Sequence, residues 1–215
     1  MKPFGLAVSM PACAPTNPSV RLRPMARRDK PDKPLPLPTE AGLHETALRH
    51  LARYATTRVG LVRVLDRRVA RWARAVEADA EAQSAPRDAV RAVVTRLVAA
   101  GVVDDAVFAA ARTTGLSRTG RSRRAVAAHL SERGVTREVA EVALAGAPAE
   151  LAAAAAAAKR RRIGPFRSVD DVSPELARKE LGVLARAGFA QDVARRALAL
   201  DRDEAEALLA QLRAT

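Results

Sequence analysis

The sequence predicts an all-α protein, an elongated tandem array of three three-helix repeats that follows a disordered N-terminal arm. Apolar residues recur at helical spacing, and few segments alternate with the period of two that a strand needs. Of the 215 residues, 48% are hydrophobic but only 3% are aromatic, which suits helices packed closely through Ala, Leu and Val. Finally, LSERGVTREVAEVAL at 130–144 aligns without a gap to LARAGFAQDVARRAL at 184–198, a spacing typical of repeat proteins.

The arm comprises residues 1–42 and contains most of the prolines, including the run KPDKPLPLPTE. Because proline lacks an amide donor and fixes its own φ, we expect this segment to be extended or disordered. Met25 is an alternative translation start, which N-terminal sequencing of the native protein would test. The opening MKPFGLAVSMPACA is interrupted by prolines, so we expect no secretion signal and a cytoplasmic protein.

The first repeat is expected at 43–101. A short helix begins near His44 and continues to Tyr54, and a longer one follows Thr57, with Trp72 and Tyr54 at apparent core positions. The longer helix has an apolar stripe on one face and an arginine stripe on the other. The arginine stripe is either a binding face or an ordinary solvated surface, and it comprises Arg63, Arg67, Arg71 and Arg74.

The second repeat is expected at 102–147. Asp104 or Asp105 caps its first helix, whose inward residues are Val107, Phe108 and Ala111. Gly115 and Gly120 break the chain within a basic stretch. The basic side chains there are Arg112, Arg118, Arg121, Arg123 and Arg124. Positive charge in the first turn of the next helix opposes the helix dipole, a conflict that a bound phosphate or carboxylate would relieve.

The third repeat is expected at 148–200, followed by a helix or tail at 201–215. An alanine-rich helix opens it and ends in four cations, Lys159, Arg160, Arg161 and Arg162. More positive charge gathers there than capping of a helix C-terminus needs. Another helix starts at Ser173. The segments LVAAGV, LSERGV and LARAGF place a glycine at three helix ends.

Catalysis finds little support in the sequence. There is one cysteine, Cys13, and the three histidines (His44, His50 and His129) lack metal-ligand spacing. No phosphate-binding loop, GxSxG or HExxH motif is present. The pairs Asp104–Asp105 and Asp170–Asp171 suit helix caps better than metal binding. We therefore expect no catalytic residue, metal or cofactor, and the protein is predicted not to be an enzyme.

A net charge of +13 and a pI near 11.3 favour a polyanionic partner. Three passages carry a resemblance to the RecX family of recombination regulators: GVVDDAVFAAA at 101–111, RSRRAVAAHLSERGVTREVAEVAL at 121–144 and KELGVLARAGFAQDVARRAL at 179–198. The segment 71–88, between the second and third helices of the first repeat, is longer than the corresponding segment in the family. The segment GLSRTGRSRR is more basic than its family counterpart. The resemblance implies tandem three-helix repeats that bind the RecA recombinase filament and restrain its strand exchange and ATP hydrolysis.

The expected partners are thus the RecA filament and DNA, contacted through its backbone, with no membrane association and a monomeric state. Twelve side chains form the expected filament- or DNA-binding surface: Arg63, Arg67, Arg71, Arg74, Arg118, Arg121, Arg123, Arg124, Lys159, Arg160, Arg161 and Arg162. The alternative is a helix-turn-helix-like regulator that acts on duplex DNA. Its recognition helix would be residues 136–146, TREVAEVALAG, which offers few base-reading side chains.

Overall fold

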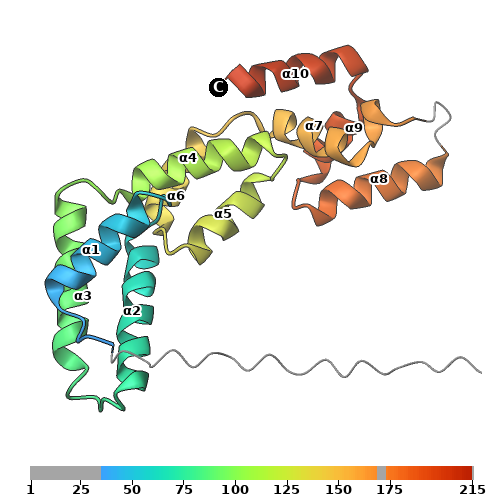
Figure 1. Ribbon diagram of the computed structural model, residues 1–215. Helices are drawn as coiled ribbons and strands as arrows, with labels where there is room; N and C mark the ends of the chain where they lie inside the picture. The colour runs from blue at the N-terminus through green and yellow to red at the C-terminus, as the bar shows by residue number, and fades with distance from the viewer. Residues whose placement is uncertain (1–34, 169–172, 215) are drawn as a thin grey trace, which may run out of the picture. The chain divides into compact units, whose positions relative to one another are not determined.

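The computed structural model describes residues 35–168 and 173–214 (Figure 1). Every regular element in these two ranges is helical, which confirms the predicted all-α fold. The elements are α1 Glu40–Leu51, α2 Arg58–Ala75, α3 Ser84–Ala99, α4 Asp105–Arg118, α5 Arg123–Glu132, α6 Arg137–Ala145, α7 Glu150–Arg161, the 3₁₀ turn η1 Gly164–Phe166, α8 Pro174–Arg186, α9 Gln191–Ala199 and α10 Arg202–Ala214.

The predicted N-terminal arm lies mostly outside the described residues, as do Cys13 and the Asp170–Asp171 pair. Where the described chain begins, α1 starts at Glu40, earlier than the expected start near His44. The Thr39 hydroxyl accepts a hydrogen bond from the Gly42 amide at 3.3 Å and caps the helix. Residues 40–42 are therefore helical.

The first three helices form one cluster, in which α1, α2 and α3 pack on one another. Leu43, Leu61 and Val93 are fully buried between them. Trp72 is buried as expected, but Tyr54 is 61% exposed. The sequence interpretation of Tyr54 as a core residue is wrong because α1 ends at Leu51, so that Tyr54 lies in the turn that follows.

The second cluster comprises α4, α5 and α6. Asp104, not Asp105, caps α4 by accepting from the amides of Ala106 and Val107. The inward face of α4 carries Phe108 as expected, whereas Val107 and Ala111 are exposed. This prediction of the buried face was therefore partly wrong.

Helix α4 also runs through Gly115 without interruption and ends only at Arg118. Gly115 therefore does not break the chain. Gly120 does, with φ +76°, a left-handed conformation that glycine adopts without steric cost. The Arg121 amide then donates to the Leu116 carbonyl at 3.0 Å, which closes the helix end.

Helix α7 is the centre of the third cluster and contacts α4, α8, α9 and α10. Its alanines are buried on several sides, including Ala154, Ala155 and Ala158 at 0% exposure. Such small side chains let neighbouring backbones approach closely. Residues 201–215 were expected to form a helix or a tail, and the described part is the helix α10, whose Leu209 and Leu212 pack on α7.

Glycines end helices in all three clusters, but only two of these glycines follow the same helix of their cluster. Gly134 and Gly188 have φ +80° and +88° and end α5 and α8, the second helices of their clusters. Gly101, with φ +67°, ends α3 instead, and the end of α2 has Glu77 at φ 52°. All three glycines therefore end helices as expected, but only Gly134 and Gly188 do so at equivalent places in their clusters.

Two buried hydroxyls join successive clusters. Thr57, which caps α2, donates to the Arg133 carbonyl at 2.6 Å. Ser122, which caps α5, donates to the Ala187 carbonyl at 2.9 Å. Each acceptor immediately precedes one of the two glycines, so the same contact links α2 to α5 and α5 to α8. The residue boundaries of the three repeats remain predictions.

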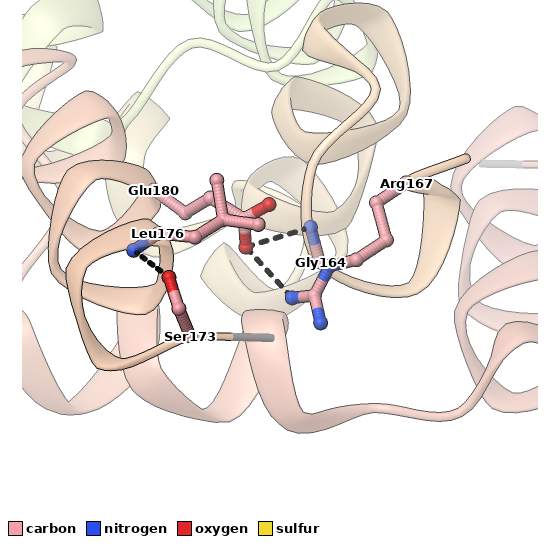
Figure 2. Close-up of polar contacts among 5 residues, drawn as sticks. All are labelled: Gly164, Arg167, Ser173, Leu176 and Glu180. Carbon is pink, nitrogen blue, oxygen red and sulfur yellow. Dashed lines mark hydrogen bonds and ion pairs between the residues drawn. The ribbon is translucent and has the colours of Figure 1, made fainter. Parts of the chain in front are cut away.

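A buried carboxylate organises the 3₁₀ turn η1 that follows α7 (Figure 2). Glu180 on α8 is 4% exposed and accepts from the Gly164 amide at 3.2 Å and from Arg167 Nη2 at 2.7 Å. The Ser173 hydroxyl caps the same helix by accepting from the Leu176 amide at 3.2 Å. This pairing fixes η1 on the third cluster.

In the described part of the chain, no single helix is long and apolar enough to cross a membrane. One pair of segments, Arg137–Ala145 with Glu150–Phe166, passes the same test of length and composition together, but the two are bent by 84° at their break. The alanines of α7 that supply much of its apolar character are buried in the fold.

Candidate basic interface

The arginine stripe lies along the exposed face of α2, as the sequence predicts. All four of its side chains are exposed, while Leu61 and Leu65 on the opposite face are buried. Arg63 donates to the Glu132 carbonyl at 3.0 Å and thereby links α2 to the end of α5. None of the four forms an ion pair with a described acidic residue.

The second expected patch divides between two places. Arg118 lies at the end of α4 and donates from Nε to the Leu212 carbonyl at 3.2 Å. Arg121, Arg123 and Arg124 are exposed at the start of α5. These three do not line the same hollow as Arg118.

The conflict expected at the first turn of α5 is relieved inside the chain. The carboxylate of Glu150, the first residue of α7, accepts from the Arg123 amide at 3.3 Å, and the Ser122 hydroxyl accepts from the Ala125 amide. A carboxylate thus already occupies the place where the sequence suggested a bound anion. The helix N-terminus by itself therefore gives no reason to expect a phosphate there.

The third patch begins with a cation that is already paired. Lys159 Nζ lies 2.6 and 2.8 Å from the carboxylate oxygens of Glu206 on α10 and 5.4 Å from the Phe166 ring centroid. The hydrogen bond from Lys159 lowers the pKa of Glu206, so this carboxylate stays charged at neutral pH. Arg160, Arg161 and Arg162 are exposed, and Arg162 ends α7 in the left-handed conformation.

The fold joins parts of the second and third patches in one groove, which we call the basic groove. It lies between the end of α4, the last turns of α7, and α10, and has a volume of about 300 Å³. Its cationic side chains are Arg118, Lys159, Arg160 and Arg213, and its apolar floor includes Leu209 and Leu212. Arg161 and Arg162 do not line it.

Sequence reasoning missed Arg213. The signal was present, because Ala205, Leu209 and Leu212 have helical spacing and place Arg213 beside the buried stripe of α10. Its significance depends on α10 folding back on α7, which the local sequence does not specify.

The basic groove has the chemistry of an anion-binding surface. Of its cations, only Lys159 has an ion-pair partner among the described residues. Arg118, Arg160 and Arg213 have none there, and a guanidinium offers a planar fork of donors to phosphate or carboxylate oxygens. No group of three His, Cys, Asp or Glu side chains in the described ranges could hold a metal ion.

The candidate recognition helix of the alternative hypothesis, α6, presents a different surface. Arg137 on its exposed face pairs with Glu141 at 2.7 Å, and Val142 is 75% exposed. The exposed Glu138 has a lowered pKa through hydrogen bonds from its own backbone amide and from Thr136, so it stays anionic. Anionic groups on this face oppose an approach to DNA phosphates.

The lowered pKa of His129 on α5 should make the stability of the fold depend on pH. Burial, and then the nearby charges of Arg133 and Arg112, lower its pKa. The unfolded chain therefore takes up a proton near pH 6.5 that the folded chain resists, and stability falls as pH drops below that value. We expect the midpoint of urea denaturation to fall from pH 7.5 to pH 5.5, and to fall less in His129→Gln. Equal falls in both proteins would contradict this role of His129.

Comparison with known proteins agrees with these observations. Residues 104–144 match the family profile of the second three-helix domain of RecX, and they span the second cluster. The regulatory protein RecX of Myxococcus xanthus is 35% identical over 159 residues, which are 73% of this chain and 83% of that protein. The regulatory protein RecX of Thermobifida fusca is 36% identical over 157 residues, 72% of this chain and 81% of that protein.

A shorter match, 34% identical over 107 residues, links half of the chain to 57% of the regulatory protein RecX of Agrobacterium fabrum. These relatives are named as regulatory proteins, in agreement with the prediction that the chain is not an enzyme. The identity and coverage of the two longer matches, together with the all-helical clusters, establish that this chain belongs to the RecX family.

Proposed function

We propose that the protein binds the RecA recombinase filament on DNA and inhibits its ATP hydrolysis and strand exchange. The observation that carries the proposal is the basic groove, in which side chains from two distant sequence patches converge in a chain of the RecX family. A recombinase filament on DNA combines phosphates with protein surface, and exposed guanidiniums can bind phosphates and acidic side chains alike. A cytoplasmic location and a monomeric state accompany this proposal as predictions.

The arginine stripe of α2 forms a second surface in the proposal. Arg67, Arg71 and Arg74 extend along α2, separate from the basic groove. Stripes of cations of this kind favour contacts to phosphate oxygens, which position a protein without reading sequence. We therefore expect binding that depends on salt and depends little on DNA sequence.

The direct test is a titration of the protein into RecA assembled on single-stranded DNA, with ATP hydrolysis and strand exchange as readouts. We expect suppression of both at fewer than one copy per recombinase subunit. No effect on either activity, combined with tight binding to naked duplex DNA, would overturn the proposal and favour the duplex-binding alternative.

Reversing two charges in the basic groove is expected to weaken filament binding about tenfold or more. The variant Arg160→Glu/Arg213→Glu places carboxylates where the proposal requires cations, and like charges across an interface are strongly unfavourable. Both side chains are exposed and have no ion-pair partner among the described residues, so helicity should not change. Affinity is measured by the fluorescence anisotropy of the labelled protein as filament is added, and helicity by circular dichroism.

The matched control is Arg195→Glu/Arg196→Glu, which makes the same total change in charge on exposed residues of α9, outside the groove. We expect it to weaken binding much less than the groove variant does. Equal losses in the two variants would show that net charge alone matters and would remove the groove from the proposal.

A further inference from the structure

A second hollow, which we call the apolar groove, lies between the turn that follows α1 and the joint of α3 with α4. Its volume is about 720 Å³, and Leu51, Phe108 and Ala111 form part of its lining. Tyr54 and Val107, which also line it, are 61% and 65% exposed. Both are among the residues whose exposure contradicted the sequence prediction.

Val102 adds a third large apolar side chain to the same surface, and it is 50% exposed. Three exposed large hydrophobic residues from two segments distant in sequence thus meet in one hollow. Contiguous exposed apolar surface of this kind marks a binding site far more often than single exposed side chains do. Val142 on α6, although 75% exposed, does not line this groove.

Hydrogen bonds hold the walls of the apolar groove in place. The Arg58 amide, just after the groove-lining segment 51–56, donates to the Asp105 carboxylate at 2.7 Å. This bond ties that segment to the beginning of α4. The neighbouring Thr57 hydroxyl is anchored to the Arg133 carbonyl at 2.6 Å. A groove whose walls are already connected loses little conformational entropy when a ligand binds.

Two arginines give the apolar groove its charge. Arg53 and Arg112 line it and form no ion pair with a described acidic residue. The Arg112 guanidinium lies 5.9 Å from the Phe108 ring centroid, so it extends along the apolar surface. The carboxylate of Asp104, which also lines the groove, is engaged by two helix amides.

This combination of an apolar lining with cationic side chains favours a peptide over a nucleobase. Apart from its polar side chains, the lining offers the hydrogen-bonding edges of a base only apolar surface such as Leu51, Val102 and Val107. Burying base edges there without partners is unfavourable. An apolar peptide side chain flanked by carboxylates satisfies both the lining and the two arginines.

We propose that the apolar groove binds an acidic peptide segment of the recombinase, with an apolar side chain inserted beside Tyr54. This inference rests on the proposed function, because it takes the recombinase as the partner. It assigns protein contact to the apolar groove, at a place distinct from the basic groove on α7 and α10.

The test is photo-crosslinking with the full-length protein in which Tyr54 is replaced by benzoylphenylalanine, bound to the RecA filament on single-stranded DNA. We expect mass spectrometry to find crosslinks to an apolar recombinase residue with Asp or Glu within a few positions. Crosslinks to DNA, or filament binding without any crosslink, would overturn the inference while leaving the proposed function intact. If the unmodified protein does not bind the filament, both the proposed function and this inference fail.

A pair of variants provides an independent check. Val107→Asp adds a like charge to the proposed peptide and should weaken filament binding about tenfold or more. Val107 is exposed in the first turn of α4, where an acidic residue suits the helix dipole, so folding should be preserved. Val142→Asp is the control on α6, and we expect less than a twofold change. Equal effects of the two substitutions would contradict the assignment.

Discussion

Gly120→Ala is expected to lower the free energy of unfolding by about 2–5 kcal/mol. Two causes add at this position. Gly120 has φ +76°, which an alanine adopts at a cost of about 1–2 kcal/mol. A Cβ there would also lie 2.5 Å from the Ala157 backbone nitrogen and 2.8 Å from its Cα. Because these are backbone atoms of the central helix α7, α4 and α7 would have to move apart.

Two other glycines separate the two causes. Gly101 has a similar φ, +67°, but a Cβ there meets nothing within 4 Å, so Gly101→Ala should lose only about 1–2 kcal/mol. Gly115 lies inside α4 with open space around it, and Gly115→Ala should gain about 0.5–1 kcal/mol. Urea denaturation followed by circular dichroism measures all three. A loss at Gly120 no greater than at Gly101 would refute the close packing of α4 on α7.

This packing also links stability to the candidate interface. Arg118 and Thr119, next to Gly120, line the basic groove, and Ala156 of α7 is part of its surface. The small residues at 120 and 156–158 bring the end of α4 against α7, and α10 closes the third side. The convergence of cations from distant patches therefore depends on residues that carry no charge.

Local signals explain why the helices could be predicted. The cap residues Thr57, Asp104 and Ser173 act on amides two or three positions away, and the apolar stripe of α2 repeats every three or four residues. Both kinds of signal are contained in a short window of sequence. The starts of α2 and α8 were therefore identified correctly.

Several of the errors have a different cause, because they depend on packing against segments distant in sequence. Glu150 caps α5 across 27 residues, and Arg213 matters only because α10 packs on α7. Val107 has helical spacing with Ala111, yet both are exposed because no described helix covers them. Periodicity identifies an apolar face, but tertiary packing decides how much of that face is buried.

Glu180→Ala is expected to lower the free energy of unfolding by about 3–5 kcal/mol, because it removes one partner of a buried ion pair. The side chains of Glu180 and Arg167 are 5% and 22% exposed. The substitution would leave the Arg167 guanidinium without its carboxylate and the Gly164 amide without its acceptor (Figure 2). Glu175→Ala, on the exposed first turn of the same helix, is the control and should change stability by less than about 1 kcal/mol.

A double variant distinguishes loss of the pair from loss of packing. Glu180→Leu/Arg167→Met replaces both charges with apolar side chains, and such replacements of buried pairs are often neutral or stabilising. We expect it to recover most of the stability lost in Glu180→Ala, although the Gly164 amide still lacks an acceptor at a cost of about 1–3 kcal/mol. If the double variant were as unstable as Glu180→Ala, the carboxylate would matter mainly as the acceptor for Gly164. The left-handed Gly164, whose Cβ would lie 2.9 Å from Leu198, would then be the residue that Glu180 holds in place.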